Sequence, residues 1–95
     1  MTLHWDSKKP GETDDRDLDW SQRLDAGDSI VSSSWAVVGA PTSLTLGVST
    51  HTDTLTKIVL SGGRPLATYT LKNTITPLLG SSPLYEFVEI EIEGM

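Results

Sequence analysis

The sequence contains no cysteine, which excludes a disulfide framework, thiolate chemistry and zinc held by cysteine ligands. It also has no long apolar run, because no stretch approaches the roughly 18–20 residues that a membrane-spanning helix needs. The first residues, Met-Thr-Leu-His-Trp-Asp, lack the basic region and the apolar core of a signal peptide. We therefore expect a chain that is made in a reducing cytosol and does not bind a membrane.

Basic residues are scarce, and the acidic residues lie mainly at the two ends of the chain. Seven Lys and Arg stand against thirteen Asp and Glu, for a net charge of −6. Residues 1–28 carry eight acids and four bases, residues 29–83 one acid and three bases, and residues 84–95 four acids and no base. Since the phosphates of nucleic acids require clustered Lys and Arg, we expect no nucleic-acid partner.

Motifs for catalysis and metal binding are missing as well. There is no Gly-x-Ser-x-Gly elbow and no Gly-x-x-x-x-Gly-Lys loop. His4 and His51 lie far apart, so a zinc site would need carboxylates to complete it. Six aspartates offer oxygen ligands for calcium but lack the spacing of an EF-hand loop, and the alternative is a solvated acidic segment. They are Asp14, Asp15, Asp17, Asp19, Asp25 and Asp28. We expect no enzyme activity, no cofactor and no metal site.

What the sequence does contain is strand periodicity, clearest between Thr54 and Ile75. Alternation over residues 67–75 places apolar and aromatic side chains on one face and threonines on the other, which predicts a strand with one buried side. Ile58 and Leu60 share a face of the preceding strand. Gly62 and Gly63 are expected to supply positive φ in the connection. We expect the two strands to form one side of a packed structure, with the opposing sheet supplied by the rest of the chain.

Similar patterns predict further strands over residues 29–38, with a bulge near 32–34, and over residues 44–48, with Leu44, Leu46 and Val48 on one face. A last strand over residues 84–93 carries acids on one face, which blunt a sheet edge. Six or seven short strands separated by turns predict an all-β, antiparallel immunoglobulin-like β-sandwich over residues 18–95. Residues 1–17 are predicted to form an extended N-terminal arm.

The core of this sandwich is expected to centre on Trp35, because tryptophan buries the largest area. The full predicted core is Trp35, Leu46, Tyr69, Leu71, Ile75, Val88 and Ile90. Tyr69 also suits the tyrosine-corner position of immunoglobulin-like domains, since it stands near the start of a late strand after a Gly-containing corner. Trp20 is interpreted as core packing beside Leu18.

Several short segments, taken together, resemble a known family. They are Lys9-Pro10, Asp19-Trp20, Leu24, Gly27-Asp28-Ser29-Ile30, Ser34-Trp35-x-Val37, Leu60-Ser61-Gly62-Gly63 and Tyr69-Thr70-Leu71-x-Asn73-x-Ile75. Their order and spacing over residues 9–76 resemble those of small tailed-phage virion proteins known as fibre–tail adaptors. The resemblance implies a structural adaptor or connector in the neck or tail, contacting tail, fibre, portal or connector proteins. Virion rings are cyclic, so several copies in a symmetric ring are also expected. The loop over residues 77–82 and the acidic C-terminal segment depart from the family pattern.

Two regions are candidates for partner binding. The first is the arm, with Trp5, Lys8, Lys9 and Pro10, which either lies across a neighbour or is a frayed terminus. The second is the loop over residues 77–83, where Leu78 and Leu79 either bury against a partner or cap the open end of the sandwich. The alternative function is a carbohydrate-binding module. It would require Trp5, Tyr85 or Phe87 to share one exposed patch.

Overall fold

Strand β6 (Thr68–Pro77) lies in the interior of the larger sheet and shows why these residues form strands. Its odd-numbered residues Tyr69, Leu71, Asn73 and Ile75 are buried, whereas the residues between them are partly or fully exposed. β6 pairs in antiparallel fashion with β3 (Ile30–Val38) on one side and with β7 (Leu84–Glu91) on the other. The period of two read from the sequence is therefore confirmed here.

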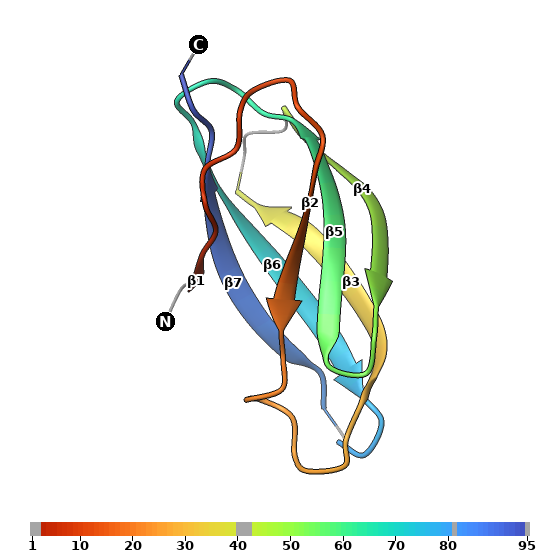
Figure 1. Ribbon diagram of the computed structural model, residues 1–95. Coiled ribbons are helices and arrows are strands. Elements are labelled where there is room, and N and C mark those ends of the chain that lie inside the picture. The colour runs from red at the N-terminus through yellow and green to blue at the C-terminus, as the bar shows by residue number, and fades with distance from the viewer. Residues whose placement is uncertain (1–2, 40–42, 81, 95) are drawn as a thin grey trace.

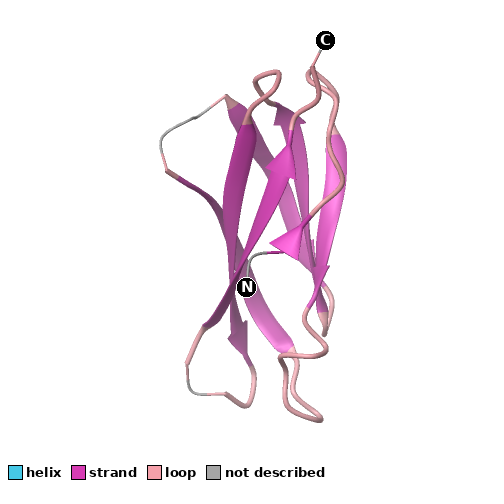
Figure 2. Cartoon of the chain, turned by 90° about the vertical axis from the view of Figure 1, so that its left-hand side faces the viewer, coloured by secondary structure: helices cyan, strands magenta, loops and turns pink. Residues whose placement is uncertain are grey.

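The computed structural model describes residues 3–39, 43–80 and 82–94, and within those ranges it contains seven strands and no helix. The other strands are β1 (Leu3–His4), β2 (Asp14–Asp19), β4 (Leu44–His51) and β5 (Leu55–Gly62). One sheet has the order β1-β7-β6-β3 and the other β2-β5-β4, and the two lie in separate layers (Figures 1 and 2). The predicted all-β sandwich is confirmed. No helix in the described part of the chain has the length and apolarity to cross a membrane.

The chain changes sheets between β5 and β6, so the expectation that these two strands form one side of the structure is wrong. β5 is the middle strand of the smaller sheet, and β6 belongs to the larger one. Gly62 and Gly63 have φ of 74° and 105°, as expected. A Cβ on Gly62 would stand 2.8 Å from the backbone oxygen of Ser43, so the corner is sterically closed to other residues. Paired glycines permit a hairpin and a corner equally, and the sequence alone does not separate them.

Tyr69 holds this corner from the start of β6. Its hydroxyl accepts a hydrogen bond from the backbone N–H of Arg64 at 3.0 Å, five residues upstream, and it also bonds the hydroxyl of Ser43. A bond from a tyrosine hydroxyl back to the backbone a few residues upstream is the contact that defines a tyrosine corner. Tyr69 thus joins the β5–β6 corner to the segment that precedes β4.

The largest fully buried side chain is Trp20, which directly follows β2 and is 1% exposed. Trp35, expected at the centre, is only partly buried, and so is Leu46. The reason is position, because β3 and β4 are the outermost strands of their sheets at one side and have neighbours on one flank only. The other five predicted core residues are buried; they are Tyr69, Leu71, Ile75, Val88 and Ile90. The remaining buried apolar residues are Leu18, Ile30, Leu44, Ile58, Leu60 and Ile92.

A buried polar network joins the two sheets at Trp20. The indole Nε1–H donates to Asn73 Oδ1 at 2.9 Å and lies 3.2 Å from the hydroxyl of Thr56. Thr56, on β5, donates to the same Oδ1 at 2.6 Å. The amide nitrogen of Asn73 donates to the Ser33 hydroxyl at 3.0 Å and to the Ser34 carbonyl at 2.9 Å. Every polar group of the Asn73 side chain is therefore bonded, which is what a buried amide requires.

Both outer strands on the β3–β4 side contain an irregularity. The pairing of β3 with β6 shifts register between Ile30 and Ser32, close to the predicted bulge. The pairing of β4 with β5 shifts between Leu46 and Ser49, which was not predicted. This second shift turns Val48 outward, where it is 70% exposed, rather than onto the face it was expected to share with Leu44.

The N-terminal segment lies along the sandwich, in place of the extended arm expected over residues 1–17. β1 pairs in parallel with β7, and Lys8 forms a further bridge with Ile92. Arg16 donates to the backbone oxygen of Asp6 at 2.6 Å. β2 already begins at Asp14. Residues 3–13, which we call the N-terminal strap, therefore connect the outermost strand of the larger sheet to that of the smaller one.

Candidate partner-binding surface

Leu78 and Leu79 directly follow β6, and hydrogen bonds hold their backbone while their side chains stay exposed. The backbone N–H of Leu78 donates to the Ser29 carbonyl, and that of Leu79 donates to the Asp28 carboxylate, each at 2.8 Å. Leu78 is nevertheless 62% exposed and Leu79 68% exposed. Since the backbone is already ordered, burying these side chains against a partner would cost little further backbone entropy.

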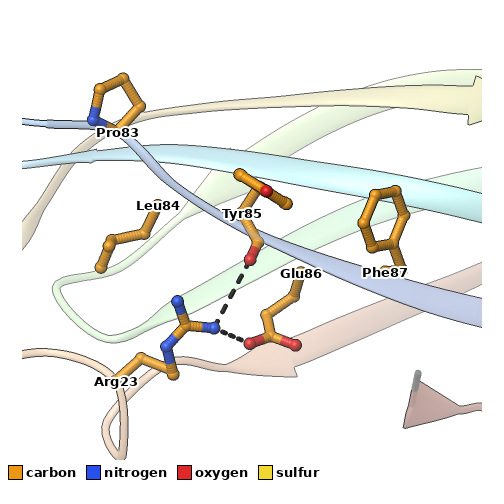
Figure 3. A pocket seen from close by; sticks show the side chains of 6 residues that line it. All are labelled: Arg23, Pro83, Leu84, Tyr85, Glu86 and Phe87. Carbon is orange, nitrogen blue, oxygen red and sulfur yellow. Dashed lines mark hydrogen bonds and ion pairs between the residues drawn. The ribbon is translucent and has the colours of Figure 1, made fainter. Parts of the chain in front are cut away.

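A shallow groove of about 400 Å³ lies beside this loop, at the start of β7. Its lining residues are Arg23, Pro83, Leu84, Tyr85, Glu86 and Phe87 (Figure 3). The guanidinium of Arg23 forms an ion pair with the Glu86 carboxylate and donates to the Tyr85 carbonyl at 3.5 Å. The two charges of the groove are thus paired with each other. The groove consequently combines proline, leucine and aromatic side chains with a paired charge, and its accessible lining is mostly polar.

β6 stops and β7 begins at the same end of the sandwich (Figure 1). Leu78 and Leu79 directly follow β6, and the groove is lined by residues at the start of β7. We call this region the β6–β7 end. Exposed apolar groups beside a groove are typical of a protein contact surface. The one carboxylate lining the groove, that of Glu86, is paired with Arg23.

Among the acids, the Asp19 carboxyl has a lowered pKa, chiefly because the backbone N–H of Ser21 donates to it at 2.8 Å. This bond stabilises the turn after β2, so the shift does not mark a general acid or base. Asp14 pairs with Arg16 at 3.1 Å and Asp15 with Lys57 at 3.5 Å. Within residues 3–39, 43–80 and 82–94, no three His, Asp or Glu side chains gather as a metal site.

Four of the six predicted contact residues lie in the N-terminal strap, where Lys8 is buried and Trp5 is partly buried against the core. Lys8 is 1% exposed, and its ammonium donates to the carbonyls of Gly62 and Lys9 at 2.7 and 2.9 Å. The ring centroid of Trp5 lies 5.6 Å from that of Trp35, and the indole Nε1–H of Trp5 donates to the Asp17 carbonyl at 3.0 Å. The proposal that Lys8 meets a partner is therefore wrong, because its ammonium is used at the β5–β6 corner.

Lys9 is exposed and Pro10 is partly exposed, and Leu78 and Leu79 are both exposed. The groove itself was missed. Its signal in the sequence was Pro83-Leu84-Tyr85, an apolar tripeptide directly after the two leucines. The partner of Glu86 was not readable, because Arg23 lies 63 positions earlier in the chain.

The aromatic residues considered for sugar binding do not form one patch. Tyr85 and Phe87 share the outer face of β7 with ring centroids 5.7 Å apart. The ammonium of Lys72 lies 4.6 Å from the Tyr85 ring centroid, within cation–π distance. Trp5 packs against the core beside Trp35 instead. The platform that sugar stacking requires is therefore incomplete and partly covered.

Comparison with known proteins adds a family to this geometry. The family model described as "Podophage GP4 fiber-tail adaptor protein gp77" matches residues 8–82 of the chain. No curated protein matches it. Among solved structures, an endo-fucoidan hydrolase of glycoside hydrolase family 107 is similar, with a TM-score of 0.60 and 11% identity. The likeness covers 99% of this chain but 13% of that enzyme, and it concerns the fold alone.

Proposed function

The chain belongs to the podophage fibre–tail adaptor family, and we propose that it links neighbouring virion proteins by burying its β6–β7 end against one of them. Membership makes it a structural component of a phage particle. We also propose that it is synthesised in the host cytoplasm and lies in the neck or tail of the particle. The identity of each neighbour is part of the same proposal.

The observation that carries the proposal is the presentation of Leu78 and Leu79. Both side chains are more than half exposed, on a backbone held by Ser29 and Asp28. Burial of a leucine side chain contributes about 1.5–3 kcal/mol, so the pair can supply a large share of a modest interface energy. The neighbouring groove adds Pro83 and Tyr85 to the same surface.

The shape of the molecule suits a link between two neighbours. Its principal extents are 45 × 22 × 19 Å, with loops at both ends of the long axis (Figure 2). The β6–β7 end carries the exposed leucines, and the opposite end carries the β5–β6 corner. We propose that several copies stand in a ring around the tail axis.

The experiment replaces both leucines with serine, giving Leu78→Ser/Leu79→Ser, and measures incorporation of the protein into particles during infection. The variant should melt close to wild type, because neither side chain packs in the core. It should be strongly depleted from purified particles, and infectivity should fall with it.

The matched control is Leu78→Met/Leu79→Met, which keeps apolar side chains at the same positions. This control should be incorporated like wild type. If the serine variant is folded and incorporated at full occupancy, the β6–β7 end is not the contact surface. If the methionine variant fails as badly as the serine variant, apolar burial is not what the site supplies.

A further inference from the structure

The side of the sandwich formed by β3 and β4 is an open edge in both sheets. Each of these strands is the last in its sheet, and the two contact each other across the layers. Within residues 3–39, 43–80 and 82–94 each of them pairs along one flank, and no described strand bonds the backbone N–H and C=O groups of its other flank. From Ser32 to Val38 the pairing of β3 with β6 is regular, so the free flank is regular over the same length.

This side carries no charge. Residues 29–52, which include all of β3 and β4, contain no Asp, Glu, Lys or Arg, although the chain has twenty such residues in total. The opposite side differs, because β2 has the sequence Asp-Asp-Arg-Asp-Leu-Asp and β1 is two residues long. Charged side chains and very short strands are the usual means of blocking edge-to-edge pairing. The β1–β2 side has both, and the β3–β4 side has neither.

The side chains on the open side leave the backbone accessible. Ser34 and Ala36 are small and exposed on the outer face of β3. Val31 is 52% exposed, Val38 44% and Val48 70%. An uncharged edge that is regular from Ser32 to Val38 is the type of edge that readily accepts another strand.

We infer that the occupant of this edge is a second copy of the same chain, paired through β3. Charge selects it. Each copy carries a net charge of −6, so two copies repel unless they meet where no acids lie. A two-fold contact brings the same surface of both copies together, so any acid near the axis would face its own counterpart. The β3–β4 side escapes this repulsion, and β3 pairing in antiparallel fashion would join two four-stranded sheets into one.

Single-cysteine cross-linking tests the geometry directly. Because the natural chain has no cysteine, one introduced cysteine can form a disulfide only with another copy. Antiparallel pairing places only the residue at the two-fold axis opposite its own counterpart, so whichever of Ser34→Cys and Ala36→Cys lies at the axis should give covalent dimers under mild oxidation. The controls Thr74→Cys and Thr70→Cys lie on β6 in the same sheet, one strand further from the edge, and should stay largely monomeric. Equal cross-linking of all four variants, or cross-linking of the controls alone, would overturn the pairing.

Sedimentation equilibrium of the purified protein tests the energetics. Wild type should show a concentration-dependent monomer–dimer equilibrium, and Ser34→Lys/Val38→Lys should raise the dimer dissociation constant by roughly tenfold or more, because four lysines meet in each pair. The matched control, Thr74→Lys/Thr70→Lys, places lysines at the β6 partners of Ser34 and Val38. It should change the dimer dissociation constant far less. Unfolding midpoints of both variants establish that each is folded.

A wild-type protein that stays monomeric at every concentration overturns the inference, and so does a dimer that the β3 lysines leave intact. If monomeric protein nevertheless loses particle incorporation in the β3 lysine variant, the edge receives a strand from another virion protein, and the second-copy assignment is wrong. None of these measurements involves Leu78 or Leu79, so the adaptor proposal stands or falls separately.

Discussion

Replacing Asn73 with aspartate should make the stability of this protein depend on pH in a way that wild type does not. In the folded protein the Asn73 amide nitrogen donates to the Ser34 carbonyl at 2.9 Å and to the Ser33 hydroxyl at 3.0 Å. A carboxylate at this fully buried position has no hydrogen to donate. It would place a negative oxygen against the Ser34 carbonyl with no cation beside it.

The magnitude follows from the burial and the lost bonds. An uncompensated buried charge destabilises by about 3–5 kcal/mol, against the roughly 5–15 kcal/mol expected for a whole domain. The neutral acid, by contrast, can donate to Ser34. The folded-state pKa of Asp at position 73 should therefore rise above its unfolded value of about 3.9. Because the folded pKa is raised, the destabilisation is full above the folded pKa and shrinks as the pH falls towards the unfolded pKa.

Urea unfolding, followed by tryptophan fluorescence, measures the effect at neutral pH and at about pH 5. The quantity compared is the difference in unfolding free energy between variant and wild type at each pH. That difference should be several kcal/mol at neutral pH and clearly smaller at acid pH. Asn73→Leu loses the same hydrogen bonds without a titrating group, so its deficit should not change with pH. The reasoning is refuted if Asn73→Asp costs less than about 1 kcal/mol, or if its deficit equals that of Asn73→Leu at both pH values.

Three further predictions concern stability. Trp20→Ala should cost about 3–5 kcal/mol by denaturant unfolding, and Trp35→Ala should cost less because its ring is only partly buried; the reverse order would contradict the core described here. Gly62→Val should lower the free energy of unfolding by more than about 1 kcal/mol through its positive φ and its contact with Ser43, and an unchanged melting temperature would show that the corner adapts. Lys8→Met should cost about 1–3 kcal/mol by leaving the Gly62 carbonyl without its donor, whereas Lys9→Met, on an exposed neighbour, should melt like wild type.

The strands could be predicted from the sequence because the alternation that marks a strand lies within a few consecutive residues. Residues 69–75 alternate between core and solvent, and burial of one face follows directly from that period. The Gly62–Gly63 pair was also readable as positive φ. Whether it turns the chain back within one sheet or across to the other depends on Tyr69, Arg64 and Ser43, which meet only in the folded corner.

Which tryptophan lies at the centre of the core depends on contacts between residues far apart in the sequence. Trp20 and Trp35 both fit a strand pattern, and only the packing shows that Trp20 finds acceptors on Asn73 and Thr56. The Nε1 of Trp35 is buried without a hydrogen-bond partner among the described residues. A sequence states how large a side chain is, but it does not state which one meets a polar partner across two sheets.

The packing of the N-terminal strap could not be predicted from the sequence for a related reason. Lys8-Lys9-Pro10-Gly11 has the composition of a solvated linker, yet the Lys8 stem packs inside and its ammonium satisfies backbone carbonyls. The surface at Leu78 and Leu79 was easier, because two leucines in a proline-containing loop have no strand face to join. Their exposure was inferred from composition, and the structure adds the hydrogen bonds that hold the loop.

A cryo-electron microscopy reconstruction of intact phage particles tests the central claim, adaptor function through the β6–β7 end, most directly. Density for this sandwich should appear in several copies between other virion proteins, with Leu78 and Leu79 of each copy buried against a neighbour. Particles without that density, or copies in which both leucines face solvent, would contradict it.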